Sequence, residues 1–153
     1  MLLESYNGNP ELECGVDEVG RGCGAGPVIA ASVILPKSFY HPKLKDSKKM
    51  SKKAKNEVYD YILQNCISYG IGISTVEEID DNNILKATMI AMHRSIDQLK
   101  EKPSLLLVDG NYFTKYGKID HQTVVKGDNK YMSIAAASVL AKVYRDRLMC
   151  KLA

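Results

Sequence analysis

The chain has 153 residues, which suits one domain of ordinary size, residues 1–153, with a buried core. Its composition, 45% hydrophobic and 25% charged, excludes a disordered chain, and it has no run of eighteen apolar residues to cross a membrane. The net charge is only +3, and residues 1–10 lack the basic start and apolar run of a signal peptide, so we expect a cytoplasmic protein with no membrane partner.

The four cysteines form no C-x-x-C pair and have no nearby histidines at ligand spacing, which argues against a zinc site or a disulfide framework. We expect reduced, packed thiols, as in a cytosolic protein.

Two strands are predicted near the N-terminus, at residues 13–19 and 27–35. The second is the β-branched run PVIAASVIL, which Pro36 ends. A glycine-dense turn, residues 20–26 (GRGCGAG), joins the two strands and indicates that they are adjacent and antiparallel.

A lysine-rich block follows at residues 36–55, where eight lysines are accompanied by a single acid, Asp46. The block carries +7 and the rest of the chain −4. One interpretation is a solvated face. The other is a surface that contacts phosphates, because clustered lysines release counterions when they meet a polyanion. The charge pattern alone leaves both open.

Ser51 is the expected N-cap of a helix that ends near Asn65, and residues 67–73 alternate enough to form a third strand. Capping-box patterns at Ser74 and Thr75 begin a helical region that we expect to continue to about residue 100.

The C-terminal third contains a short buried strand at residues 104–108 (SLLLV) and a fifth strand at residues 122–125. A final helix is expected from about residue 129 to the C-terminus, and its AAAS segment, residues 135–138, is small enough for close backbone packing. The order β-β-α-β-α-β-β-α predicts an α/β fold in which helices flank a mixed five-stranded sheet.

Acidic residues occur where these strands should be apolar. Asp17 and Glu18 interrupt the first strand, and Asp109 follows four apolar residues at the end of another. A buried carboxylate is costly unless a positive partner satisfies it, so strand-end acids brought together would require a cation between them. Oxygen ligands without histidine or cysteine favour Mg²⁺ or Mn²⁺.

Each acid also has an ordinary alternative. Asp17 and Asp109 could be turn residues beside Gly20 and Gly110, and Asp128 could be the N-cap of the final helix. The spacing of these residues leaves the alternatives open.

The octapeptide GVDEVGRG, residues 15–22, resembles the N-terminal signature of the type 2 ribonucleases H, and of ribonuclease HII in particular. Further blocks resemble the family in the same order and extend the resemblance over about 130 residues. These blocks are GPV (26–28), LKDSKK (44–49), VEEI with NIL (76–79 and 83–85), VDGN (108–111), VKGD (125–128) and IAAASVLAKVYRD (134–146).

The resemblance implies a ribonuclease H-like fold and an endonuclease that hydrolyses the RNA strand of RNA–DNA hybrids. It also implies cleavage 5′ of ribonucleotides embedded in duplex DNA, as in ribonucleotide excision repair, by a monomer that leaves a 5′-phosphate and a 3′-hydroxyl. The family's catalytic and metal-binding acids fall on Asp17, Glu18, Asp109 and Asp128, with Asp17 as the bridging ligand of two Mn²⁺ or Mg²⁺ ions. Because successive strand residues point to opposite faces, Asp17 and Glu18 can share a site only if the strand ends or bulges there.

Recognition of RNA requires contact with the 2′-hydroxyl. The resemblance assigns that contact to backbone groups of the turn Gly20-Arg21-Gly22, where glycine leaves room for close approach. Arginine at position 21 matches the HII subfamily, whereas threonine is typical of HIII. Contacts to backbone phosphates fall on Ser47, Lys48 and Lys49.

The chain departs from the family pattern at its C-terminus. HII enzymes normally continue beyond the position of Ala153, through a segment with a tyrosine that helps to recognise the DNA–RNA junction, and no tyrosine of this chain takes that role. Two alternatives to an active hybrid-cleaving enzyme therefore stay open: a non-catalytic nucleic-acid-binding remnant, and a different nuclease on the same fold, such as a DNA junction resolvase.

Overall fold

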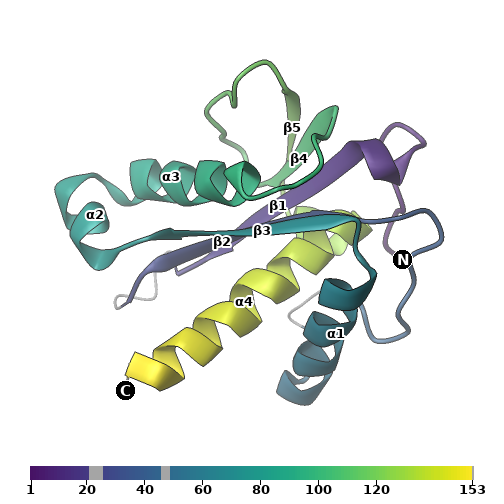
Figure 1. Ribbon diagram of the computed structural model, residues 1–153, viewed down its shortest axis with the longest axis horizontal. Helices are drawn as coiled ribbons and strands as arrows, with labels where there is room; N and C mark the ends of the chain where they lie inside the picture. The colour runs from purple at the N-terminus through teal and green to yellow at the C-terminus, as the bar shows by residue number, and fades with distance from the viewer. Residues whose placement is uncertain (21–25, 46–48, 153) are drawn as a thin grey trace.

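The structure is a computed structural model that describes residues 1–20, 26–45 and 49–152. Its centre is a five-stranded sheet in the order β3-β2-β1-β4-β5 (Figure 1). Strands β1, β2 and β3 pair antiparallel, whereas β4 pairs parallel with both β1 and β5, so the predicted mixed sheet is confirmed. The strands are β1 (Glu13–Val19), β2 (Val28–Ile34), β3 (Ser68–Ser74), β4 (Leu105–Asp109) and β5 (Asp120–Val124).

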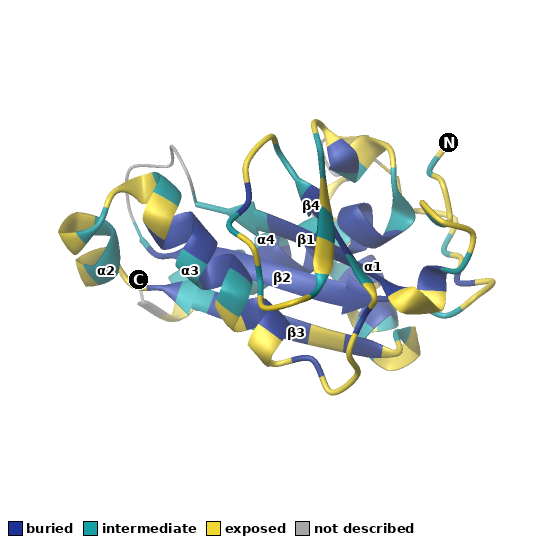
Figure 2. Ribbon diagram, turned by 90° about the horizontal axis from the view of Figure 1, so that it is seen from above, coloured by how far each residue is buried: buried dark blue, intermediate teal, exposed yellow. Residues whose placement is uncertain are grey.

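Helices cover both faces of the sheet. On one face, α1 (Lys52–Asn65) and α4 (Met132–Leu152) pack over one hydrophobic cluster, and on the other face α3 (Ile84–Asp97) packs over a second. The sides of the helices that face the sheet are buried and their outer sides are exposed (Figure 2). The short helix α2 (Val76–Asp81) lies at one end of the molecule.

The sequence of strand β2 accounts for the presence of helices on both faces of the sheet. Ile29, Ala31 and Val33 belong to the cluster under α1 and α4, whereas Val28 and Ala30 belong to the cluster under α3. All seven residues of the strand are buried because successive side chains enter opposite cores. A continuous apolar run is typical of a strand that is covered on both faces.

The helical region expected from Thr75 to about residue 100 is two helices, and the single-helix prediction was wrong. Asn82 ends α2 in an extended conformation, and the Asn83 side chain accepts a hydrogen bond from the Lys86 amide to cap α3. Asparagine competes with the helical backbone through its own side chain, so two consecutive asparagines favour an end and a new start.

The final helix begins at Met132, later than predicted, because a short 3-10 helix, Gly127–Asn129, precedes it. Its first turn approaches β1 very closely: a Cβ on Gly15 would lie only 2.2 Å from the carbonyl carbon of Ser133. The glycine therefore lets the beginning of α4 rest directly on the central strand, beside the strand's acidic end.

Two expectations from composition concern the chain as a whole. Cys14, Cys66 and Cys150 are free thiols, but only Cys14 is buried as expected of a packed thiol, Cys66 being partly buried and Cys150 exposed; Cys23 lies outside the described residues. Within residues 1–20, 26–45 and 49–152, none of the helices combines the length and hydrophobicity that a bilayer-spanning helix requires.

Candidate active site

The register of the two central parallel strands places two of the predicted acids side by side. Val16 of β1 pairs with Val108 of β4, so the next residues, Asp17 and Asp109, lie level on adjacent strands, where β4 ends. Both valines belong to the core under α3. Side chains alternate along a strand, so Asp17 and Asp109 point to the other face, towards the beginning of α4.

Asp128 reaches the same region from the 3-10 helix Gly127–Asn129, which connects β5 to α4. The amide of Gly127 donates a hydrogen bond of 2.7 Å to Oδ1 of Asp109. A Cβ on Gly127 would lie 2.5 Å from Cδ1 of Ile134, so a larger residue here would require the Ile134 side chain to move. The structure thus joins the Asp128 segment to the Asp109 carboxylate, and the charge of Asp128 acts on both Asp17 and Asp109.

Burial and mutual repulsion strongly perturb Asp17. Its side chain is 5% exposed, and desolvation raises its pKa well above the ordinary value. The negative charges of Asp109, Glu18 and Asp128 raise this pKa further, and they outweigh the Glu18 amide, which donates to Asp17 Oδ1 at 2.8 Å and lowers it.

The pKa of Asp109 is also raised, first by burial and then by the charge of Asp128. Hydrogen bonds from the amides of Gly127 and Asp128, and from the Asp17 side chain, act in the opposite direction. Asp17 and Asp109 therefore form a pair of neighbouring carboxyl groups that both have raised pKa values. In such a pair, negative charges lie close together despite their mutual repulsion.

Glu18 lies beside this group but on a different face of the strand. The expected bulge is absent: Asp17, Glu18 and Val19 pair in unbroken register with Ala31, Ala30 and Ile29. The Glu18 side chain therefore leaves β1 opposite to Asp17. Glu18 is partly exposed, past the residue where β4 ends, and its charge still raises the pKa of Asp17.

The donor chemistry of this site fits a hard divalent cation. Asp17, Asp109 and Asp128 offer only carboxylate oxygens, the ligand type of Mg²⁺ and Mn²⁺, and their concentrated negative charge is what such an ion would neutralise. In the described part of the chain, no three His, Cys, Asp or Glu side chains are already grouped to hold a metal ion. Joint ligation requires the carboxylates to rotate towards a common point, a movement that their repulsion opposes until a cation neutralises them.

The sequence also allowed turn or capping roles for three of the acids, and the structure gives a different answer for each. Asp109 is indeed followed by a turn, since Gly110 has φ of +115°, but the aspartate side chain is also part of the acidic group. Asp128 does not occupy the N-cap position of α4, because the helix begins four residues later. Asp17 lies within β1 and not in a turn.

The predicted substrate-binding residues are placed only in part. Gly20 follows β1 with φ of +116°, a conformation that favours glycine. Arg21, Gly22, Ser47 and Lys48 lie outside the described residues.

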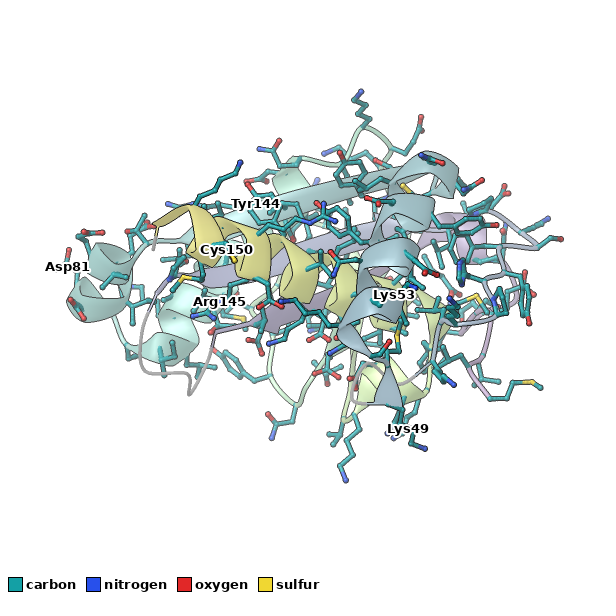
Figure 3. All side chains as sticks on the ribbon, turned by 90° about the horizontal axis from the view of Figure 1, so that it is seen from below. Lys49, Lys53, Asp81, Tyr144, Arg145 and Cys150 are labelled. Atoms are coloured by element: carbon teal, nitrogen blue, oxygen red, sulfur yellow. The ribbon has the colours of Figure 1, made fainter. Side chains whose placement is uncertain are left out.

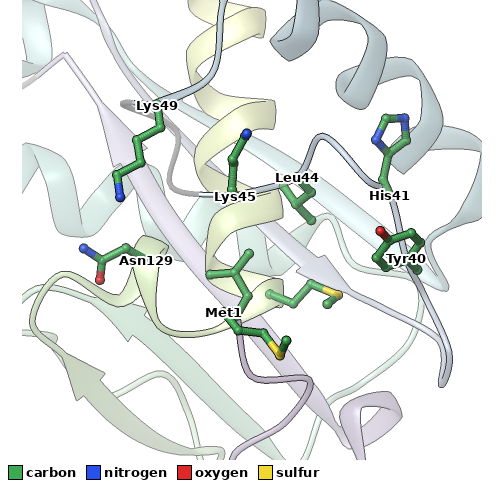
Figure 4. A pocket seen from close by; sticks show the side chains of 9 residues that line it. Met1, Tyr40, His41, Leu44, Lys45, Lys49 and Asn129 are labelled. Atoms are coloured by element: carbon green, nitrogen blue, oxygen red, sulfur yellow. The ribbon is translucent and has the colours of Figure 1, made fainter.

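Lys49, from the lysine-rich block, lines a cavity of about 540 Å³ between that block, the N-terminus and the approach to α4 (Figure 4). Asn129, the neighbour of Asp128 in the chain, also lines this cavity, together with Lys45. Two lysines therefore open onto a hollow that is also lined by the residue next to Asp128 in the chain.

Sequence reasoning missed one residue that shapes the site, Gly127, and one buried charged residue, Arg145. Gly127 supplies the amide that holds Asp109, and the only signal in the sequence was its position next to Asp128. Arg145 is buried in α4, and the signal available was an arginine one helical turn after the inward-facing Ala141.

Comparison with solved structures defines the class. The ribonuclease HII of Archaeoglobus fulgidus, solved in a complex with PCNA, superposes with a TM-score of 0.78 at 27% identity, over 92% of this chain and 76% of that chain. Bst-RNase HIII in complex with Mn²⁺ superposes with a TM-score of 0.77 at 17% identity, over 94% of this chain and 55% of that chain. The fold is therefore that of the type 2 ribonucleases H.

Sequence comparison gives the family. The family model described as Ribonuclease HII matches residues 14–153. A ribonuclease HII of Parabacteroides distasonis is 53% identical over 152 residues, which is 99% of this chain and 76% of the relative. The chain belongs to the ribonuclease HII family. It is an endoribonuclease of a divalent-metal-dependent family that acts on RNA–DNA hybrids.

Proposed function

We propose that this protein cuts the RNA strand of RNA–DNA hybrids and also cuts 5′ of single ribonucleotides in duplex DNA, leaving a 5′-phosphate and a 3′-hydroxyl. The observation that carries the proposal is the side-by-side placement of Asp17 and Asp109 on adjacent parallel strands, at the residue where β4 ends, with Asp128 close enough to raise the pKa of both.

Two Mn²⁺ or Mg²⁺ ions are the proposed cofactors, held by Asp17, Glu18, Asp109 and Asp128. When bound, such ions lower the pKa of a water molecule and stabilise the leaving oxygen. Asp17, the most buried of the four acids, is the proposed bridging ligand. Glu18 takes part by reaching around the end of β4, which does not extend beyond Asp109. The Mn²⁺ complex of Bst-RNase HIII, on the same fold, supports this ion type.

The turn Gly20-Arg21-Gly22 is proposed to read the 2′-hydroxyl through its backbone. Gly20 lies three residues after Asp17, so a ribose bound at the turn would place its phosphate near the acids. The absence of a side chain at Gly20 leaves its backbone open to the sugar.

Lys49, with Ser47 and Lys48, is proposed to hold backbone phosphates of the bound duplex. Support comes from the cavity that Lys45, Lys49 and Asn129 line, because it brings positive charge to the residue that follows Asp128 in the chain. We also propose that the protein acts as a cytoplasmic monomer in the removal of ribonucleotides from DNA.

The test is a labelled DNA duplex with one ribonucleotide, incubated with the 153-residue chain and Mn²⁺ or Mg²⁺. We expect a cut immediately 5′ of the ribonucleotide, no cut in an all-DNA duplex, and loss of the cut when EDTA is added. Binding without cleavage would instead support a nucleic-acid-binding protein, and cleavage of the all-DNA duplex would support a different nuclease on this fold.

A further inference from the structure

Strand β1 carries a buried carboxylate that is not part of the acidic group. Glu13, the first residue of the strand, is 2% exposed, and it shares a face of β1 with Asp17 because side chains alternate along a strand. A buried carboxylate is costly unless hydrogen-bond donors surround it. The donors come from the N-terminal segment, residues 1–9: Oε1 accepts from the amide of Tyr6 at 2.8 Å, and Oε2 from the amide of Asn7 at 2.6 Å.

The N-terminal segment is also joined to the beginning of α4. The amide of Leu3 donates a hydrogen bond of 2.8 Å to the carbonyl oxygen of Lys130, and the carbonyl oxygen of Leu3 accepts one of 2.9 Å from the amide of Met132. Met132 is the first residue of α4, so its amide has no acceptor within the helix. The ring of Tyr6 lies 6.0 Å from that of Tyr131. The N-terminal segment thus caps α4 and holds the residues that lead into it.

Asp128 lies between this contact and the acidic group. The 3-10 helix that carries it is attached at its start, where the amide of Gly127 donates to Asp109. The hydrogen bond from Leu3 reaches Lys130, two residues after Asp128, and the amide of Lys130 donates to the carbonyl oxygen of Gly127 at 3.0 Å. A displacement of the N-terminal segment would therefore be passed to Asp128 through two residues of backbone.

We propose that Glu13 is a positioning residue for the metal site: by holding the N-terminal segment, it fixes the place of Asp128 relative to Asp17. This inference rests on the proposed function, in which Asp128 is a metal ligand. Glu13 is four residues from Asp17 along β1, roughly 13 Å at the rise of an extended strand, so it acts through the backbone and does not itself ligate the ion. It should therefore govern how tightly the ion is held, rather than the rate of cleavage once the ion is bound.

Two pairs of variants test this connection, each with its own control. Glu13→Gln keeps the shape of the side chain but places an NH₂ group against one of the backbone amides. Its control is Glu11→Gln, since the exposed Glu11 accepts from the amide of Lys37 instead. Leu3→Pro removes the amide that donates to Lys130, whereas Leu3→Ala keeps this amide and shortens an exposed side chain.

A further control separates positioning from stability. Tyr144 lies in the C-terminal half of α4, as do Arg145 and Cys150 (Figure 3), and it packs against the core under α1 and α4. Tyr144→Ala should lower the Tm by removing part of this packing, far along the helix from the contact with Leu3. A variant that binds Mn²⁺ less well only because its fold is weaker would be matched by this control.

Three quantities would be measured for each protein. The first is the Kd for Mn²⁺ of the free protein, by titration calorimetry. The second is the rate of hydrogen exchange at the amides of residues 130–132 in EDTA. The third is the rate of cleavage of the one-ribonucleotide duplex over a range of Mn²⁺ concentrations, which separates the Mn²⁺ requirement from the rate at saturation.

Glu13→Gln and Leu3→Pro should each raise the Kd for Mn²⁺ by about tenfold, a usual effect of losing a group that orients a metal ligand. Exchange at residues 130–132 should be faster, because the hydrogen bonds that protect these amides open more often. The cleavage rate at saturating Mn²⁺ should stay within about twofold of the wild type, since the ligands themselves are unchanged. The wild-type Kd should be kept by the three controls, Glu11→Gln, Leu3→Ala and Tyr144→Ala.

A wild-type Kd for Mn²⁺ in folded Glu13→Gln and Leu3→Pro would overturn the inference and leave the proposed function intact. An equally raised Kd in Tyr144→Ala would overturn it too, because lost stability would then explain the effect. If Glu13→Gln does not fold, the two Leu3 variants decide, and an equal Kd in both rejects the inference. A wild-type chain that binds Mn²⁺ without cutting the duplex would refute the proposed cleavage alone, and one that does not bind Mn²⁺ would refute the metal site and the inference together.

Discussion

On both faces of the sheet, a glycine in a strand allows a helix to pack very closely, but the two interfaces serve different purposes. On the α3 face, Gly72 lets the helix come so close that a Cβ there would lie 2.0 Å from the Ala91 carbonyl oxygen. On the α4 face, Gly15 does the same against Ser133. In both places a glycine replaces a side chain so that helix backbone and strand can touch.

The two interfaces bury different polar groups. Under α3, the buried hydroxyl groups are paired: Ser32 with Ser95 at 2.5 Å, and Ser74 with the Ala87 carbonyl oxygen at 2.5 Å. Near the beginning of α4, the structure instead gathers carboxylates, and burial together with neighbouring negative charge raises the pKa of Asp17 and of Asp109. The α3 face therefore contributes to the stability of the fold, whereas the acidic end of the α4 face lowers stability because negative charges are brought together there.

The largest effect should follow from Asp17→Asn, which removes a charge from the acidic group and leaves its shape. We expect cleavage of an RNA–DNA hybrid to fall by about a thousandfold or more, as is common when a charged catalytic group is lost. The assay is hybrid cleavage with Mn²⁺. Asp120→Asn, at an exposed position of β5, is the control and should keep full activity. Substantial cleavage by the Asp17 variant would remove this residue from the site.

Replacing either glycine by alanine should destabilise the fold to a similar extent, but only one of the two changes should also affect the response to Mn²⁺. Gly15→Ala and Gly72→Ala should each lower the free energy of unfolding by about 3 kcal/mol, because backbone rather than a flexible side chain blocks the new Cβ. Urea denaturation measures this loss. In the molecules that remain folded, only Gly15→Ala should weaken the Mn²⁺ response. An equal loss of that response in both variants would show that the two faces are not functionally distinct.

A smaller effect is expected from Ser95→Ala on the α3 face. It removes hydrogen bonds to Ser32 and to the Met92 carbonyl oxygen, which should lower the free energy of unfolding by about 1 kcal/mol. Cleavage activity should stay at the wild-type level, since the change lies on the face away from the acids. Loss of activity without loss of folding would mean that the α3 face contributes to catalysis.

The smallest effect should come from Lys49→Ala, measured by duplex binding over a range of salt concentrations. Removing one phosphate contact should weaken binding a few fold and reduce the slope of log K against log salt by about 1. Lys102→Ala, an exposed lysine in the α3–β4 connection, should leave the slope unchanged. An unchanged slope in the Lys49 variant would favour the solvated-face interpretation of the lysine-rich block.

Much of the fold could be predicted because local patterns and tertiary structure agree. The apolar run of β2 and the Ser51 cap of α1 were both readable. The break at Asn82 and Asn83 was missed because no proline or glycine separates the capping box at Thr75 from the apolar repeat that begins at Leu85, and only the side-chain caps reveal two helices.

The residues of the site could be predicted from the sequence more readily than their arrangement in space. Carboxylates at apolar strand ends were visible in the sequence, but the pairing of Val16 with Val108, which aligns Asp17 with Asp109, depends on long-range strand order. Arg145 shows the same limit. Its acceptor, the Pro27 carbonyl, lies 118 residues away, and no local pattern predicts such a hydrogen bond.

The pH dependence of stability follows from the raised pKa values of Asp17 and Asp109. Above the ordinary aspartate pKa of about 4, the unfolded chain gives up these protons while the folded chain retains them. The folded state then binds more protons, so without divalent ions its stability should fall as pH rises from that value through the raised pKa values. At neutral pH, Asp17→Asn should therefore be more stable than the wild type in EDTA.

Thermal unfolding at neutral pH, with and without Mn²⁺, tests the central claim most directly. Saturating Mn²⁺ should stabilise the wild type, by about 2.7 kcal/mol at a hundred times the Kd, and should have little effect on Asp17→Asn or Asp109→Asn. The order of stability of wild type and Asp17→Asn in EDTA should thus be reversed by the ion. If Mn²⁺ left the wild type unchanged, or stabilised all three proteins equally, these carboxylates would not form a metal site.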